Sequence, residues 1–161
     1  TEILKEFPSL YRSKWLKMMR NKLGLFQEHK NDEILIFELL DWMKKNKADY
    51  TNTFCFLMNE HYGDNKIYNH NDFILWKKKW EKRQKINLDK SLKLMRKANP
   101  LIIPRNHLVE KSLNQAEKGN LEKFSELNEV LKKPYNKTPS ILDFQATPNL
   151  NDKKYVTFCG T

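Results

Sequence analysis

Apolar residues recur along most of this chain with the spacing of an α-helix. From Ile36 to Met43 they fall at i, i+3, i+4 and i+7, which places their side chains on one helical face. Other segments show the same period, and residues that favour helix ends flank them. The expected helices run from about Pro8 to Leu23, Asn31 to Met43, Asp49 to Glu60, Asn71 to Trp80, Asn87 to Met95, Pro104 to Ala116, and Asn120 to Leu131. We therefore predict an all-α fold of about six to seven helices.

Glycine, asparagine and proline mark the ends of these expected helices. Gly24 and Gly119 suit the left-handed position just past a helix end. Asn31 precedes two acids, Asp32 and Glu33, a pattern typical of a capped helix start whose dipole favours negative charge. Pro134 cannot continue a helix and is expected to stop the last one.

The character of the chain changes after Pro134. Prolines at 134, 139 and 148 and several asparagines disfavour a regular helix. Only residues 155–158 have the composition of a strand. We predict one helical domain over residues 1–134 and an extended tail over residues 135–161, which holds at most a short strand and ends in Cys159, Gly160 and Thr161.

The composition fits one packed domain. The chain has 161 residues, of which 39% are hydrophobic and 12% aromatic, enough for a core and unlike a disordered segment. No stretch reaches the roughly 18 apolar residues of a membrane span, and no signal-peptide pattern opens the chain, so we expect no membrane partner. Because the chain starts at Thr1 and not at methionine, we expect a trimmed start or a fragment of a longer protein.

The net charge is strongly positive, +10, and 25 of the 30 basic residues are lysines. Arginine forks onto phosphates and bases, whereas lysine is a solvated point charge. Asparagine is also abundant, so part of the lysine excess reflects compositional bias. We do not expect a nucleic-acid partner on charge alone, and a basic helical binding module for RNA or an acidic protein partner is the alternative function.

The sequence lacks the motifs that carry catalysis. It has no glycine-rich loop to cradle a phosphate. Asp72 and Phe73 are followed by isoleucine within a helical pattern, and Asp143 and Phe144 by glutamine, so neither pair matches the Asp-Phe-Gly metal site of a kinase. The 2 cysteines and 4 scattered histidines form no disulfide framework and no zinc site.

Three other features are better explained by structure than by function. Cys55 lies between two phenylalanines on an expected helix, so we predict a buried core thiol and not a nucleophile. Asp32 and Glu33 start a helix, where the helix dipole explains them without catalysis. Trp76 and Trp80 share one helical face, so we expect both indoles to be buried, and stacking on RNA bases is the alternative.

Several short segments, taken in order, resemble the selenoprotein O family, also called the YdiU family. They are MRNKLGL at 19–25, LLDWM at 39–43, DYTNTF at 49–54, NP at 99–100, RNHL at 105–108, AEKGN at 116–120 and KPY at 133–135. The chain then closes with Cys159, Gly160 and Thr161, where the family ends in cysteine or selenocysteine followed by two serines. The resemblance covers nearly the whole chain, from about Trp15 to Thr161.

This resemblance implies the helical C-terminal part of a kinase-like fold. Enzymes of the family are protein adenylyltransferases that bind ATP inverted, with magnesium or manganese, and pass AMP to Ser, Thr or Tyr hydroxyls of proteins. Their ATP- and metal-binding residues lie in a more N-terminal core, and no residue here matches those motifs. The resemblance thus implies an inactive fragment without catalytic, cofactor or metal residues, whose partner is that core, in an enzyme whose partners are protein substrates. It places bacterial members in the cytoplasm and eukaryotic relatives in mitochondria.

The resemblance also assigns roles to particular residues. It implies chemistry only for Cys159, a redox candidate whose partner would be a cysteine of the core; a tail cysteine with no role is the alternative. The family's arginine after Phe54 is replaced by Cys55, and pairing Cys159 with Cys55 instead requires Cα atoms within about 7 Å. The motif residues expected to have a structural role are Asp49, Tyr50, Thr51, Phe54, Asn99, Pro100, Arg105 and Asn106.

Overall fold

The computed structural model describes residues 2–84 and 87–148, and it confirms the all-α prediction. These residues form eight α-helices and one 3-10 helix, without a strand. They fall into two compact units, Thr1–Asn99 and Pro100–Thr161, so the helical domain expected over 1–134 spans the first unit and part of the second. The strand expected at 155–158 and the chain end with Cys159 lie outside the described residues.

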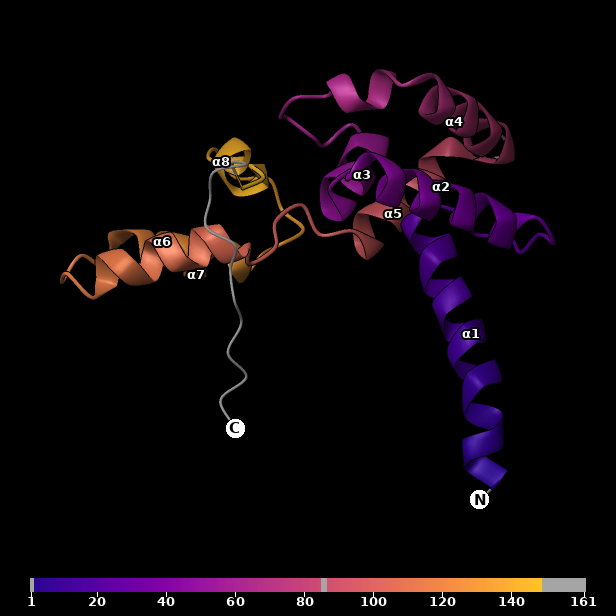
Figure 1. Cartoon of the computed structure of the whole chain (residues 1–161), viewed down its shortest axis with the longest axis horizontal. Helices are drawn as coiled ribbons and strands as arrows, with labels where there is room; N and C mark the ends of the chain where they lie inside the picture. The colour runs from indigo at the N-terminus through magenta and orange to yellow at the C-terminus, as the bar shows by residue number, and fades with distance from the viewer. Residues whose placement is uncertain (1, 85–86, 149–161) are drawn as a thin grey trace. The chain divides into compact units, whose positions relative to one another are not determined.

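The first unit contains five of the α-helices (Figure 1). Helix α1 packs against α5 and α2, and α2 packs against α4. The 3-10 helix η1 lies beside α4 and closes the loop that leads into it. The bounds are α1 (Glu2–Lys22), α2 (Asp32–Asn46), α3 (Tyr50–Leu57), η1 (Lys66–Asn69), α4 (Asn71–Gln84) and α5 (Leu88–Ala98).

The apolar period seen in the sequence forms the core of this unit. Phe54, Phe73 and Ile36 are fully or almost fully buried. Trp76 and Trp80 are also buried, with ring centroids 6.0 Å apart and nearly parallel planes. Their indole N–H groups donate to the carbonyls of Leu35 at 2.8 Å and Leu23 at 2.9 Å. The expectation of buried indoles is therefore confirmed, and each polar N–H has the partner that a buried tryptophan needs.

Only some of the helix starts and caps match those predicted from the sequence. Asp49 caps α3 by accepting a hydrogen bond from the Asn52 N–H at 2.8 Å, and Asn87 caps α5. The cap expected from Asn31 is wrong, because its side chain makes no capping bond at the start of α2. Helix α1 begins at Glu2, so Pro8 lies inside it and does not open it. Proline cannot donate to the carbonyl four residues earlier, but this part of α1 is exposed, where water can replace the lost bond.

The second unit is a helical hairpin with a short third helix. Helices α6 (Asn106–Ala116) and α7 (Glu122–Leu131) pack side by side, and the turn between them contains Gly119 at a φ of +85°. The amide groups of Leu101 and Ile102 both donate to the Pro134 carbonyl, at 2.8 and 3.1 Å. These bonds fix the segment before α6 to the segment after α7.

The expected extended conformation after Pro134 is wrong for one turn, helix α8 (Ile141–Gln145). Eight residues separate the prolines at 139 and 148, which leaves room for a short helix. Ile141 and Phe144, three positions apart, bury one face of it. The Arg105 guanidinium donates to the Phe144 carbonyl at 3.2 Å, and a cation at the last carbonyls stabilises a helix end.

Candidate functional site around Lys22

The last turn of α1 carries a half-buried lysine, Lys22, at the meeting point of three helices. Its Nζ lies 3.1 Å from Oδ1 of Asn99, to which it donates. The same nitrogen lies 4.9 Å from the ring centroid of Phe54 and 5.4 Å from that of Tyr50, both on α3. A cation at this distance from a ring is attracted by the ring quadrupole. Lys22 is thus held by one amide and two aromatic rings.

Asn99 is the buried polar centre of this arrangement. Its side-chain amide donates to the carbonyl of Lys22 at 2.8 Å and to the carbonyl of Met95 at 2.9 Å, while its oxygen accepts from Lys22 Nζ. Asn99 is only 1% exposed, so these bonds form away from water, where an unpaired polar group is costly. One side chain therefore joins the end of α1 to the end of α5.

The start of α3 is fixed by two local bonds. Besides the cap from Asp49, the Thr53 hydroxyl donates to the Asp49 carbonyl at 2.7 Å. The Tyr68 hydroxyl of η1 approaches Thr53 Oγ1 at 3.4 Å, so η1 is tied to the same turn. These contacts set the direction of α3, and with it the rings that Lys22 meets.

Burial dominates the electrostatics of the cluster. Loss of water lowers the pKa of the Lys22 ammonium, and the nearby Cys55 sulfur acts in the opposite direction. Burial raises the pKa of Tyr50, and it raises the pKa of Tyr68 to about 12. Neither an amide nor these phenols exchange protons near neutral pH. The contacts of the Lys22 cluster join the ends of α1 and α5 to the rings of α3.

A second polar centre, around Asp32, was interpreted from the sequence only as a helix-start acid. Asp32 is 0% exposed, and its carboxylate accepts from Arg20 Nε at 3.0 Å and from Arg83 Nε at 2.8 Å. It also accepts from the backbone N–H of His29 at 2.9 Å. A buried carboxylate between two arginines joins α1, α2 and α4, so the dipole explanation is incomplete.

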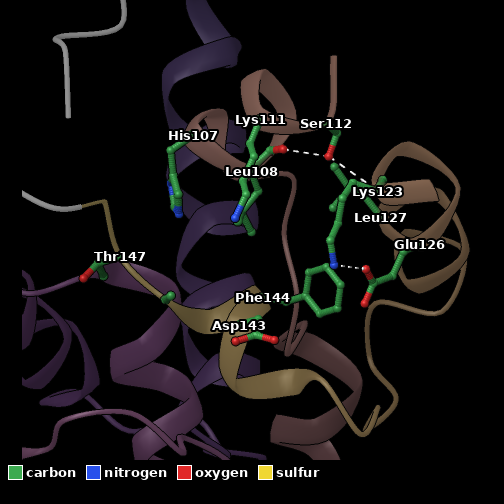
Figure 2. A pocket seen from close by; sticks show the side chains of 11 residues that line it. His107, Leu108, Lys111, Ser112, Lys123, Glu126, Leu127, Asp143, Phe144 and Thr147 are labelled. Atoms are coloured by element: carbon green, nitrogen blue, oxygen red, sulfur yellow. Dashed lines mark hydrogen bonds and ion pairs between the residues drawn. The ribbon is translucent and has the colours of Figure 1, made fainter. Parts of the chain in front are cut away.

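The second unit holds a cavity of about 570 Å³ lined by residues of α6, α7 and α8 (Figure 2). Leu108, Leu127 and Phe144 supply its apolar wall. Lys123 points along this wall and its ammonium lies 2.8 Å from the Glu126 carboxylate. The lining also includes Lys111 and Asp143, so the charges around the cavity are mixed in sign.

Among residues 2–84 and 87–148, no group of three or more His, Cys, Asp or Glu side chains gathers as a metal ion would require. Over the same residues, no helix combines the length and apolar character that a bilayer crossing demands.

Comparison with known proteins decides the family. The family model described as "Protein adenylyltransferase SelO" matches residues 1–132. The chain belongs to the SelO family. Its first 132 residues carry the match, which includes the Lys22 cluster, the Asp32 cluster and both helices of the α6–α7 hairpin.

Curated relatives of this SelO chain are bacterial proteins named "Protein nucleotidyltransferase YdiU". The one from Pelagibacter ubique is 49% identical over 164 residues, covering 100% of this chain and 34% of the relative. Those from Clostridium perfringens and Nitrosococcus oceani are each 42% identical, covering 98% and 99% of this chain and 33% of each relative. The chain therefore spans about a third of the length of the relatives it matches.

The structure brings some of the SelO motif residues together and leaves others apart. Tyr50, Phe54 and Asn99, from distant motifs, meet at Lys22, and Asp49 caps the helix that carries the two rings. Thr51 is half-buried in α3. Their expected roles as structural residues remain predictions, although each now has a described environment.

The remaining motif residues lie at or after the start of the second unit. Pro100 is half-buried, Arg105 is buried and bonds to the Phe144 carbonyl, and Asn106 is exposed at the start of α6. Cys55, which stands where the family has arginine, is 0% exposed, as a core thiol should be. Sequence reasoning missed Lys22 as the centre of the cluster, although it lies inside the first quoted motif, because nothing local signals its partners 28 to 77 positions away.

Proposed function

We propose that this chain is the helical C-terminal region of a protein adenylyltransferase. In that enzyme the hydroxyl oxygen of a protein Ser, Thr or Tyr attacks the α-phosphorus of ATP, AMP becomes bonded to the protein, and pyrophosphate leaves. Magnesium or manganese neutralises the phosphate charge when bound. The residues that bind ATP and metal belong to the rest of the polypeptide, and this region supports its fold.

The observation that carries the proposal is the match to the SelO family over residues 1–132, together with relatives named protein nucleotidyltransferases. Two further facts agree with a supporting role. The chain spans about a third of the length of those relatives. Its polar centres, Lys22 with Asn99 and Asp32 with its two arginines, connect helices.

The proposal is tested by comparing the chain with the full-length polypeptide. We expect full-length protein, incubated with α-³²P-labelled ATP and magnesium, to label itself or added protein, whereas γ-labelled ATP transfers nothing. Calorimetry of the 161-residue chain with ATP and magnesium should show no binding. Heat of binding from the chain would contradict placing the nucleotide site elsewhere, and transfer from γ-labelled ATP would contradict adenylylation.

A redox role for the tail belongs to the same proposal. Cys159 would respond to reductant by breaking a disulfide with a cysteine of the core, gaining two electrons and two protons per bond from a thiol reductant. The activity of the full-length enzyme should then change on reduction, and Cys159→Ser should abolish the change. Cys55→Ala is the matched control, because Cys55 is buried in α3. A response that persists in Cys159→Ser refutes this role.

A further inference from the structure

The N-terminal half of α1 carries a large apolar surface. Leu4, Phe7, Leu10 and Tyr11 have exposed fractions of 74%, 61%, 55% and 60%. The rings of Phe7 and Tyr11 stack, with centroids 6.2 Å apart, so they form one surface and not scattered contacts. Single exposed apolar residues are common, but four on three successive helical turns are a sign of an interaction site.

This surface is a second face of α1, distinct from the one that packs into the first unit. At about 100° per residue, the members of this surface other than Leu10 fall, together with Trp15 and Met18, within about 80° of the helix circumference. We call them the α1 stripe: Leu4, Phe7, Tyr11, Trp15 and Met18. Met19 and Leu23, which are buried, point about 100° away from the centre of the stripe. Helix α1 therefore has two apolar faces, one that packs within the first unit and one that is largely exposed.

The α1 stripe continues onto α2. The ring of Trp15 lies 5.4 Å from the ring of Phe37, which is itself 46% exposed. The exposed Arg12–Glu33 ion pair, at 2.6 Å, runs alongside this contact between α1 and α2. The stripe is thus anchored at its C-terminal end, and its N-terminal turns present the apolar surface in a defined direction.

We propose that the α1 stripe docks onto the remaining two thirds of the same polypeptide. This rests on the proposed function, in which the chain is one region of a longer enzyme. The relatives are about three times as long as the part this chain covers, and the stripe lies inside the segment that matches the family. The uncovered portion is large enough to supply the missing partner surface.

The size of the stripe favours docking within one polypeptide over a dimer. Aromatic side chains bury about 150–250 Å² each, so the exposed parts of the stripe and Leu10 sum to on the order of 500 Å². A stable interface between separate molecules buries about 800 Å² on each partner. A tethered partner needs less, because covalent connection gives an effective concentration in the millimolar range.

Hydrogen exchange on the wild-type protein tests the docking directly. We expect the amides of residues 4–15 to exchange at least about tenfold more slowly in the full-length polypeptide than in the 161-residue chain, because covering the stripe suppresses fraying. Equal exchange in the two proteins would overturn the proposal. Adenylyl transfer is measured on the same full-length sample. An active enzyme whose amides exchange as fast as those of the 161-residue chain would refute the docking without contradicting the proposed function.

A pair of substitutions locates the effect on the stripe. Phe7→Glu with Tyr11→Glu should restore fast exchange in the full-length protein, and the milder Phe7→Ala with Tyr11→Ala should do so in part. Leu121→Glu is the matched control, because Leu121 is 59% exposed but lies in the second unit. Sedimentation of the chain alone should show a monomer; a dimer dispersed by the Phe7 and Tyr11 substitutions would mean that a second copy covers the stripe.

Discussion

Replacing Asp32 by asparagine separates two explanations of this acid. If Asp32 only complements the dipole of α2, loss of its charge costs about 0.3–1 kcal/mol of unfolding free energy. If it is the counter-ion of Arg20 and Arg83, the same change leaves two arginines facing an amide donor in a site where the carboxylate is fully buried. Removing one partner of a buried ion pair costs about 3–5 kcal/mol.

The structure favours the larger value. Arg20 and Arg83 are only 14% and 21% exposed in their side chains, and the His29 N–H also depends on Asp32. Part of the loss is offset, because Arg20 also contacts Glu28 at 3.1 Å and Arg83 also donates to the Gln27 carbonyl. We therefore expect Asp32→Asn to cost about 3 kcal/mol, which lowers the melting temperature by roughly 6–12 °C in a chain of this size.

Urea unfolding followed by tryptophan fluorescence measures this cost, since all 4 tryptophans of the chain lie in the first unit. The neighbouring Glu33→Gln is the matched control, because Glu33 pairs with an Arg12 whose side chain is 66% exposed. Its urea midpoint should stay close to wild type, and 1 M salt should abolish any difference. An Asp32→Asn midpoint as close to wild type as that of Glu33→Gln would refute the ion-pair explanation.

Three further predictions concern stability. Gly24→Ala should lower the free energy of unfolding by at least about 2 kcal/mol more than Gly119→Ala. Both glycines have a positive φ, but a Cβ at Gly24 would lie 2.9 Å from the Ser91 carbonyl oxygen, whereas a Cβ at Gly119 meets nothing within 4 Å. Thermal melts by circular dichroism compare the two variants, and equal losses would refute the steric argument. Asn99→Ala should cost about 2 kcal/mol, because the Lys22 carbonyl loses its side-chain donor and the Met95 carbonyl keeps only the Asn99 backbone N–H at 2.9 Å. Lys22→Met should cost less than about 1 kcal/mol, since it also removes the cost of burying a charge. Urea titrations compare the two variants, and the reverse order would contradict the role of Asn99. Burial raises the pKa of Tyr68 to about 12, so the native state keeps the phenol proton while the unfolded state loses it above pH 10. About 2–3 kcal/mol of the free energy of unfolding should therefore disappear between pH 10 and 12. Tyr68→Phe should lack this loss when unfolding is measured across that range, and parallel curves for the two proteins would show that Tyr68 titrates normally.

Features set by neighbours along the chain were predictable from the sequence. The Asp49 cap depends on an N–H three residues away, and the buried Trp76–Trp80 pair depends on four-residue spacing within α4. Gly24 was placed correctly after a helix because only glycine tolerates its φ of +70° without strain. In each case the interacting groups lie within about one helical turn of each other along the chain, so local residue spacing is enough to predict the feature.

Features set by distant partners were not predictable in this way. Asp32 looks like a helix-start acid until Arg83, 51 positions later, is placed beside it. Helix α8 has only the single i, i+3 pair of Ile141 and Phe144 as a local signal, and its end is stabilised by Arg105 from a segment 39 positions earlier. The family motifs hold part of this missing information, because the segments at 19–25, 49–54 and 99–100 supply the ammonium, the two rings and the buried amide that meet in the Lys22 cluster. In the proposed function, the motif residues of this region serve to join its helices, and the active site that they support lies elsewhere in the polypeptide.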